Sequence, residues 1–354
     1  MQARHLVMVL ALTAAGCAVD PPPPAATVAP VGMRSVPAKM LATPDTVSPE
    51  MKALIGAPLP AWWNLNPQSP AAWKQWIAER AAATNATLPE LREKLGVNVT
   101  SVTVGGVPCF MVEPRSVSAA NRNRLLVHVH GGGYVLAPGE AGTREAILMA
   151  GYGGYRVLSV DYRMPPDHPY PAAMDDAMAV WRAVLATHKA RNMAIFGTST
   201  GGGMALAMVL RAKAEHLPLP AAIAPGTPWS DLTKTGDSYY ANEMVDNVLV
   251  SNDGWLGKAA LLYANGHDLR DPYLSPVYGD VAGFPPTILT TGTRDLFLSN
   301  TVRMHRKLRQ AGVVADLNVY EGQSHAQYGA AAFAPETREA FGDIARFFNV
   351  HLGQ

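Results

Sequence analysis

The most informative stretch of this 354-residue chain is Met193-Ala194-Ile195-Phe196-Gly197-Thr198-Ser199-Thr200-Gly201. Its four apolar residues predict a buried strand, and the apolar run from Met204 to Leu210 predicts a helix. A G-x-S-x-G pattern at a sharp turn between a strand and a helix is typical of a nucleophile elbow. The glycines remove Cβ atoms that would collide, and the N-terminal amides of the helix favour negative charge near Ser199.

A second glycine-rich motif lies upstream of the elbow. The apolar run Leu125–Val129 predicts a buried strand and is followed by His130-Gly131-Gly132-Gly133-Tyr134. Glycines at such a place let backbone amides approach a substrate carbonyl, as in an oxyanion loop of the HGGG type. A flexible turn is the alternative interpretation, but the position after a core strand favours the oxyanion loop. The predicted oxyanion donors are the backbone amides of Gly131, Gly132 and Thr200.

A serine hydroxyl needs a base, and an acid must orient that base. In the chain order serine, acid, histidine, the strand-like run Pro286–Gly292 precedes Asp295, and the run Ala315–Tyr320 precedes His325. Both residues therefore fall at the carboxyl edge of a predicted parallel sheet, where open α/β sheets build their sites. We expect His325 to be the general base and Asp295 the acid. Rival acids, none of which directly follows a core strand at the right place, are Asp268, Asp271 and Glu321.

These residues give the chain a resemblance to the bacterial hormone-sensitive-lipase-like esterases, family IV of the lipolytic α/β-hydrolases. Besides the HGGGY loop and the elbow, the segment DYRMPPDHPYPAAMDD at Asp161–Asp176 is similar to the family's DYRLAPEHPFPAALDD block. The resemblance covers the chain from about Leu95 to Gly353. It implies that His130, Asp161 and Arg163 give structural support to the oxyanion-loop side of the site.

The elbow departs from the commonest family pattern at two positions. Thr198 stands where many members have aspartate, so the sequence is more similar to the GTSAG-type branch. Thr200 replaces the alanine usual in that branch. A β-branched residue beside the nucleophile narrows the acyl side of the predicted pocket slightly. Its backbone amide can still donate to an oxyanion.

Alternating helical and strand-like segments predict an α/β fold, here an α/β-hydrolase fold with a mostly parallel doubly wound sheet and a helical cap. Residues 50–95 are expected to form N-terminal cap helices, with a helix restarting at Pro89. Residues 96–354 form the expected catalytic domain, and the loop-rich insertion 230–283 forms the second cap part. The predicted strands are Val97–Val104, Val107–Val112, Leu125–His130, Arg156–Val160, Met193–Phe196, Ala221–Ala224, Pro286–Gly292 and Ala315–Tyr320.

Several aromatic residues lie in or beside the insertion 230–283. They either line an apolar pocket above the site or pack the interior of the cap. For each aromatic residue, cap packing is the favoured interpretation, because a cap needs a core of its own. These residues are Trp229, Tyr239, Tyr240, Trp255, Tyr263 and Tyr273.

The N-terminus has the pattern of an exported lipoprotein. Residues 1–17 combine Arg4, an apolar run and Ala14-Ala15-Gly16-Cys17, which resembles a lipobox with Cys17 as the lipidated residue. Ordinary signal cleavage with an incidental cysteine is the alternative. The Pro/Ala-rich residues 18–49 predict an extended tether. The expected location is a periplasm-facing membrane, the outer membrane rather than the inner one, with the lipid anchor as the membrane partner.

Composition excludes several other classes of protein. The formal net charge of +1 gives no electrostatic footprint for nucleic acid. The chain has two cysteines and no CxxC or HExxH motif, so neither a metal nor another cofactor is expected. Cys109 is interpreted as a small buried hydrophobe. No feature of the sequence indicates an oligomeric state.

The resemblance and the motifs together predict a serine carboxylesterase, a carboxylic ester hydrolase with a Ser-His-Asp triad. The expected substrates are small esters with short- to medium-chain acyl groups, because a cap encloses the pocket. Two alternatives remain open on the sequence. One is a periplasmic serine amidase or peptidase, and the other is a catalytically silent lipoprotein that uses the fold for binding.

Overall fold

The computed structural model of the protein describes residues 32 and 34–353. The chain divides into two units, Met1–Ala42 and Thr43–Gln354. The predicted signal peptide, residues 1–17, and residues 18–31 of the predicted tether lie outside the described residues. Residues 34–42 form neither helix nor strand.

The second unit begins earlier than the sequence predicts. The tether was expected to extend to residue 49, but the compact unit includes Thr43 onward. The Thr46 hydroxyl donates to Glu321 at 2.5 Å, and the Ser48 amide and hydroxyl donate to Glu336 at 2.6 and 2.8 Å. Hydrogen bonds to distant carboxylates therefore attach residues 43–49 to the folded unit.

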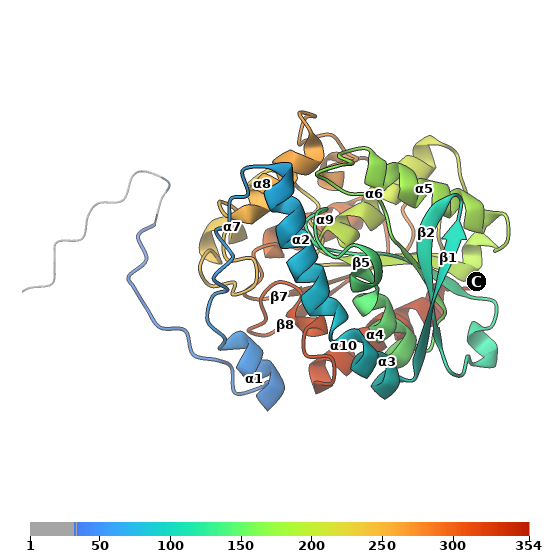
Figure 1. The fold of residues 1–354 in the computed structure, drawn as a ribbon, viewed down its shortest axis with the longest axis horizontal. Helices are drawn as coiled ribbons and strands as arrows, with labels where there is room; N and C mark the ends of the chain where they lie inside the picture. The colour runs from blue at the N-terminus through green and yellow to red at the C-terminus, as the bar shows by residue number, and fades with distance from the viewer. Residues whose placement is uncertain (1–31, 33, 354) are drawn as a thin grey trace, which may run out of the picture. The chain divides into compact units, whose positions relative to one another are not determined.

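A single sheet organises the second unit (Figure 1). Its strand order is β1-β2-β4-β3-β5-β6-β7-β8, with β1 and β2 antiparallel to their neighbours and β3 to β8 in parallel pairings. The strands are β1 Val97–Val104, β2 Val107–Pro114, β3 Leu125–Val129, β4 Val157–Val160, β5 Met193–Thr198, β6 Ala222–Gly226, β7 Thr287–Gly292 and β8 Ala315–Tyr320. The predicted α/β-hydrolase fold with a mostly parallel sheet is confirmed.

Helices cover both faces of this sheet. Neighbouring residues of β5 show the alternation: Ile195 packs into one hydrophobic cluster, and Phe196 packs into the other. Because both faces of the central strands are covered, these strands are buried along their length and mostly apolar, as parallel strands usually are. The first cluster includes α5 Ala172–Leu185, α6 Thr200–Ala214 and α9 Leu298–Gln310, and the second includes α4 Arg144–Gly153 and α10 Pro335–His351.

The two predicted cap parts contain helices that contact each other. Trp76 on α2 lies with its ring centroid 5.2 Å from that of Trp255 on α8, and Trp62 lies 6.2 Å from Trp255. The N-terminal helices are α1 Pro49–Ile55, α2 Pro70–Asn85 and α3 Leu88–Leu95; those of the insertion are α7 Ser238–Ala241 and α8 Trp255–Ala264. The short 3-10 helices are η1 Ala119–Asn121, η2 Gly139–Thr143, η3 Ala190–Asn192, η4 Pro276–Tyr278 and η5 Gln327–Gly329.

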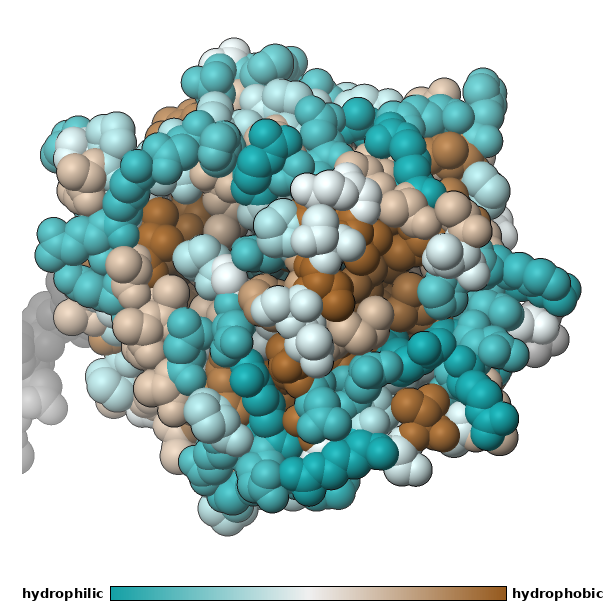
Figure 2. Space-filling view, turned by 45° about the vertical axis from the view of Figure 1, so that its right-hand side comes forward, coloured by the Kyte–Doolittle hydropathy of each residue, from teal (hydrophilic) through white to brown (hydrophobic). Residues whose placement is uncertain are grey.

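The aromatic residues in or beside the insertion pack both within the cap and against the rest of the fold. Trp255 contacts Trp62 and Trp76, whereas Tyr263 stacks on Tyr134 and Trp229 stacks on Phe297. Trp229, Tyr239 and Tyr263 are fully buried, and Trp255 is nearly so. Tyr240 is 65% exposed and is the exception. Figure 2 shows one face of the molecule, where hydrophobic residues reach the surface in separate patches within a hydrophilic surround.

Candidate active site

Ser199 occupies the turn between β5 and α6 with a strained backbone. Its φ of 64° and ψ of −123° lie outside the regions that a residue with a Cβ prefers. Two backbone hydrogen bonds hold this geometry. The Ser199 amide donates to the Gly226 carbonyl at 2.9 Å, and the Trp229 amide donates to the Ser199 carbonyl at 2.9 Å.

The glycines of the elbow are required by a close approach to β3. A Cβ at Gly197 would lie 2.1 Å from the Val129 carbonyl oxygen, and one at Gly201 would lie 2.0 Å from the same atom. Both distances are far inside van der Waals contact. The G-x-S-x-G pattern therefore lets α6 start directly against the end of β3, where the oxyanion loop begins.

The predicted oxyanion donors lie beside Ser199. A Cβ at Gly131 would be only 3.2 Å from the Cβ of Ser199, so the loop and the elbow are in contact. Among the described residues, the backbone amides of Gly131, Gly132 and Thr200 donate no hydrogen bond to another group. Thr200 is fully buried and Gly131 and Gly132 are partly buried, so these three unpaired amides are candidate donors to a ligand oxygen.

His130 fixes the start of the oxyanion loop. Its ring stacks on Tyr162 with centroids 4.1 Å apart, and the Tyr162 hydroxyl donates to the His130 carbonyl at 2.6 Å. Nδ1 of His130 donates to the Gly131 carbonyl at 2.8 Å. Burial lowers the pKa of His130 to about 4, so the ring is neutral at pH 7.

The two other supporting residues have different partners. A carboxylate oxygen of Asp161 accepts the Gly139 amide at 2.8 Å, which holds the chain that follows the oxyanion loop. Arg163 instead forms a bidentate ion pair with Asp176 on α5, with N–O distances of 2.8 to 3.1 Å. Among the described residues, Arg163 makes no recorded contact with the oxyanion loop. Its observed contacts fix the DYR segment to α5.

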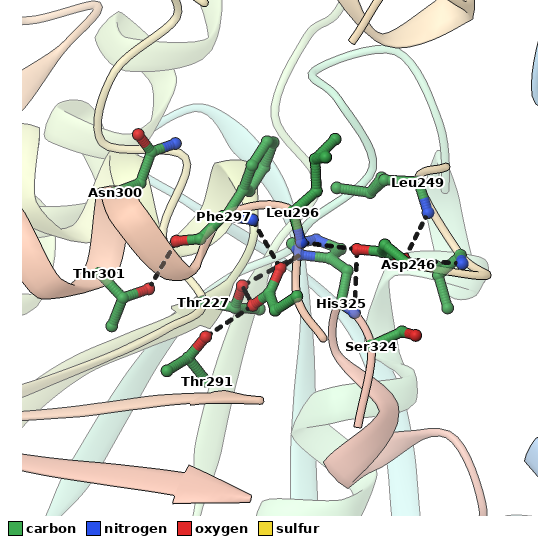
Figure 3. Close-up of polar contacts among 12 residues, drawn as sticks. Thr227, Asp246, Leu249, Thr291, Leu296, Phe297, Asn300, Thr301, Ser324 and His325 are labelled. Carbon is green, nitrogen blue, oxygen red and sulfur yellow. Dashed lines mark hydrogen bonds and ion pairs between the residues drawn. The ribbon is translucent and has the colours of Figure 1, made fainter. Parts of the chain in front are cut away.

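Asp295 and His325 are brought together from the loops after β7 and β8. Figure 3 shows the polar contacts around His325, with Thr227 and Thr291 nearby. Nδ1 of His325 lies 3.0 Å from Oδ1 of Asp295, and both side chains are buried. The aspartate also accepts the Thr291 hydroxyl at 2.8 Å and the Phe297 amide at 2.8 Å. These bonds fix the carboxylate so that it faces Nδ1.

Thr227 and Phe297 are site residues that the sequence interpretation missed. The Thr227 hydroxyl donates to Asp295 and lies 3.0 Å from Nδ1 of His325. The Phe297 ring contacts the His325 ring edge-on, with centroids 4.8 Å apart. Thr227 directly follows β6, so its place at the carboxyl edge of the sheet was the available signal.

Ser199 stands beside this pair without bonding to it. Its amide is bonded to Gly226, and the next residue, Thr227, contacts His325. No hydrogen bond joins the Ser199 hydroxyl to His325 among the described residues, and Nε2 of His325 is buried without a partner. Since catalytic hydrogen bonds often tighten only when substrate binds, this geometry is compatible with a base that acts on Ser199.

The rival acids lie elsewhere. Asp268 and Asp271 accept backbone amides within the insertion, from Arg270 at 2.9 Å and Tyr273 at 2.8 Å. Glu321 accepts the Thr46 hydroxyl. Within residues 34–353, none of these three carboxylates contacts His325.

A second buried carboxylate, Asp246, lies next to the pair. It comes from the insertion between α7 and α8, where no sequence motif indicated a site residue. Oδ2 accepts the Leu296 amide at 2.8 Å and the His325 amide at 3.3 Å. Burial and the nearby Asp295 charge raise the pKa of Asp246 to about 6.

Thr198, the residue before the nucleophile, belongs to a separate polar network. Its hydroxyl donates to Glu145 at 2.6 Å and accepts from the Tyr328 hydroxyl at 2.6 Å. The other carboxylate oxygen of Glu145 lies 3.1 Å from Nε2 of His128. A carboxylate from α4 thus reaches the elbow position at which many family members carry aspartate.

A cavity of about 220 Å³ opens beside His325. Its lining is mainly apolar and includes Leu148, Val248, Ala326 and Phe341. Thr198 and Glu145 supply polar atoms. No set of three His, Cys, Asp or Glu side chains that could hold a metal ion occurs in the described part of the chain.

Sequence comparison relates the chain to known hydrolases. A sequence profile of the family described as alpha/beta hydrolase fold matches residues 126–329. An esterase of Acinetobacter venetianus is 32% identical over 233 residues, which are 64% of this chain and 75% of the relative. An acetyl-hydrolase of Streptomyces hygroscopicus is 29% identical, over 72% of this chain and 83% of the relative.

Solved structures give the same relationship. The crystal structure of an esterase, E25, superposes with a TM-score of 0.87 at 44% identity, covering 90% of this chain and 99% of that one. An esterase from the bacterial hormone-sensitive lipase family superposes with a TM-score of 0.71 at 28% identity, covering 86% and 99%.

The Asp295–His325 contact predicts the effect of neutralising the acid. Asp295→Asn keeps the side-chain volume but no longer stabilises an imidazolium or selects its tautomer, so kcat for an ester should fall by roughly 10³- to 10⁴-fold. Steady-state kinetics with p-nitrophenyl butyrate provide the measurement. Glu321→Gln, at the exposed rival, is the control and should retain activity. Near-wild-type turnover in Asp295→Asn with a loss in Glu321→Gln would reverse the assignment.

Proposed function

The chain belongs to the bacterial hormone-sensitive-lipase-like esterases of the α/β-hydrolase fold, and from this premise we propose that it is a serine carboxylesterase with Ser199 as its nucleophile. The main support is the buried pair of Asp295 and His325 next to the strained elbow. The unpartnered Nε2 of His325 and the free amides of the oxyanion loop add to this support.

In the first half of the reaction, Nε2 of His325 takes the Ser199 hydroxyl proton while Oγ bonds to the ester carbonyl carbon. The carbonyl oxygen becomes an oxyanion and accepts hydrogen bonds from the amides of Gly131, Gly132 and Thr200. Asp295 stabilises the imidazolium. The C–O bond to the alcohol then breaks, and the imidazolium returns the proton to the leaving alkoxide.

In the second half, water replaces the alcohol. His325 removes a proton from the water, whose oxygen attacks the acyl-enzyme carbonyl and forms a second oxyanion in the same place. Collapse of this intermediate breaks the bond to Ser199 Oγ, which recovers the proton from His325. The carboxylic acid leaves, and the enzyme returns to its starting state.

Covering of the site by the cap supports short- to medium-chain substrates. Trp255 of the insertion packs against Gly133 of the predicted oxyanion loop, where an added Cβ would lie 2.7 Å from its ring, so the cap restricts the space beside the predicted oxyanion donors. The exposed large apolar residues of the insertion are Tyr240, Met244 and Leu261. They do not follow one another in the sequence, so they do not form a continuous exposed apolar segment. The assignment to the GTSAG-type branch stays a prediction.

Replacing the nucleophile tests the proposed function. Ser199→Ala should lower the hydrolysis of p-nitrophenyl acetate and butyrate by at least about 10⁴-fold, and His325→Ala should reach a similar residual rate, because members of one catalytic unit are not additive. The wild-type protein should also react stoichiometrically with a fluorophosphonate, and Ser199→Ala should not. Faster turnover of amides than of esters would favour an amidase, and absence of labelling in the wild type would favour a binding protein.

The position of the cap leads to a prediction on chain length. In a series of p-nitrophenyl esters, kcat/KM should be highest for short acyl chains and decline for long ones, because the cap leaves little room beside the oxyanion loop. No increase in rate should occur above the solubility limit of the substrate. Efficient hydrolysis of emulsified long-chain triglyceride would contradict the enclosed site.

The lipid anchor is a separate proposal that rests on the sequence of residues 1–49. We propose that Cys17 is acylated and that the Pro/Ala-rich segment connects it to the folded unit. Ala18 lacks the aspartate that commonly retains lipoproteins in the inner membrane, which favours the outer one. Among residues 32 and 34–353, no helix combines the length and apolar character needed to cross a bilayer.

Cell fractionation tests the anchor. After expression of the full gene in a Gram-negative host, the wild-type protein should sediment with membranes, because two or more acyl chains anchor stably. Cys17→Ser should block lipidation and release active enzyme, since the proposed site residues all belong to the other unit, Thr43–Gln354. Soluble, unlipidated wild-type protein in the periplasm would disprove the anchor and leave the esterase proposal intact.

A further inference from the structure

Asp246 is a fully buried carboxylate beside the Asp295–His325 pair that the proposed reaction does not use. It accepts four backbone amides, and none of its recorded hydrogen bonds comes from a Lys or Arg side chain in the described part of the chain. Oδ1 receives the amides of Val248 at 2.7 Å and Leu249 at 3.0 Å. Oδ2 receives those of Leu296 and His325. Such a set of donors suits an ionised carboxylate, because it accepts at both oxygens and donates nothing.

These four bonds join three separate parts of the chain, and Figure 3 shows those from Leu249, Leu296 and His325. Val248 and Leu249 belong to the cap insertion. Leu296 directly follows Asp295 in the loop after β7, and His325 lies in the loop after β8. One oxygen atom therefore contacts the backbone of both loops that carry the Asp295–His325 pair.

We propose that Asp246 is a positioning residue that fixes the loops of Asp295 and His325 relative to each other and couples them to the cap. This inference rests on the proposed esterase function. All recorded hydrogen bonds to the Asp246 carboxylate come from backbone amides, so these bonds act on the placement of His325 and Asp295. A shift of about 1 Å in such a base is enough to lower a rate by roughly 100-fold.

The neighbouring residue Asn247 strengthens the same connection. Its amide donates to the Ser324 hydroxyl at 3.1 Å, and its side-chain carbonyl accepts from Gln327 at 2.9 Å. The side-chain NH₂ of Asn247 donates to the Leu54 carbonyl of α1 at 2.8 Å. Residues 246–247 thus form hydrogen bonds to the loop after β8, which carries His325, and to the N-terminal helix α1.

The ionised form of Asp246 makes the connection. The groups that act on its charge are Asp295, which together with burial raises the pKa, and His325, which lowers it. With the pKa raised to about 6, the carboxylate is ionised at pH 8 and takes up a proton as the pH falls below 6. A protonated oxygen cannot accept an amide in the same way, so the loops should lose their fixed placement in acid.

The substitution Asp246→Asn tests this role, because it keeps the shape and replaces one acceptor oxygen by a donor. At pH 8, kcat for p-nitrophenyl butyrate should fall by about 10- to 100-fold, while KM changes by less than about twofold. The matched control is Asp231→Asn. Asp231 is also fully buried in the insertion, but it pairs with Arg303 at 2.7 Å and Tyr278 at 2.9 Å, away from both loops. The control should lower the Tm and leave kcat near that of the wild type.

The pH dependence of kcat provides a readout that a purely structural role would not change. A reaction that needs a single general base gives log kcat a slope of one in acid. If Asp246 must also be ionised, the slope should approach two in the wild type and return to one in Asp246→Asn. If the variant does not fold, the wild-type slope still decides, and a slope of one would overturn the role of Asp246.

The possible failures are distinguishable. If Asp246→Asn retains wild-type kcat and an unchanged acid slope while Ser199→Ala is inactive, the positioning role is wrong and the esterase proposal stands. If Asp246→Asn and Asp231→Asn lose kcat equally in proportion to their loss of Tm, Asp246 is only a structural residue. If the wild type hydrolyses no ester, or Ser199→Ala retains hydrolysis, the proposed function itself is wrong.

Discussion

The close approach of α6 to the end of β3 is the constraint on which the candidate site depends. The Val129 carbonyl lies where any Cβ at Gly197 or Gly201 would have to be, so only glycine permits this crossing. As a result, Ser199 and the oxyanion loop meet at one point of the sheet edge. The backbone strain at Ser199 is stabilised by hydrogen bonds to the segment after β6, which also supplies Thr227. Three neighbouring strand ends thus contribute to a single site.

Two fully buried carboxylates, Asp295 and Asp246, lie next to each other at this edge without a paired Lys or Arg among their recorded contacts. An isolated buried charge would cost many kcal/mol. Here hydroxyls, backbone amides and His325 donate hydrogen bonds to the carboxylate oxygens and offset that cost. The arrangement is a poor source of stability. Its physical value is that each carboxylate is held in a fixed direction before substrate binds, which is the condition for electrostatic catalysis.

The sequence predicted the features that follow from local patterns. Apolar runs bounded by turns correctly predicted the strands, and the order of motifs correctly predicted that Asp295 and His325 lie side by side. The catalytic role of Ser199 stays a prediction. It failed where long-range side-chain bonds decide. Thr46 and Ser48 bind carboxylates far along the chain, so a proline-rich composition wrongly extended the tether through them. Asp246 lies in a loop without a repeating pattern, and its role depends on amides that only the folded chain brings near. Arg163 was assigned to the oxyanion loop, whereas its partner Asp176 was already within the quoted DYR segment.

The cap insertion contacts the candidate site at two places, the oxyanion loop and the loop that carries His325. These contacts argue against a cap that moves independently of the site. On one side, Trp255 packs so closely on Gly133 that a Cβ there would lie 2.7 Å from its ring, next to the predicted oxyanion donors. On the other side, Asp246 and Asn247 hold the histidine loop. A displacement of the insertion would therefore disturb the oxyanion loop and the base together. The cap is then part of the preorganised site, and its packing through Trp76 and Trp255 contributes to the geometry of the reacting groups as well as to enclosure.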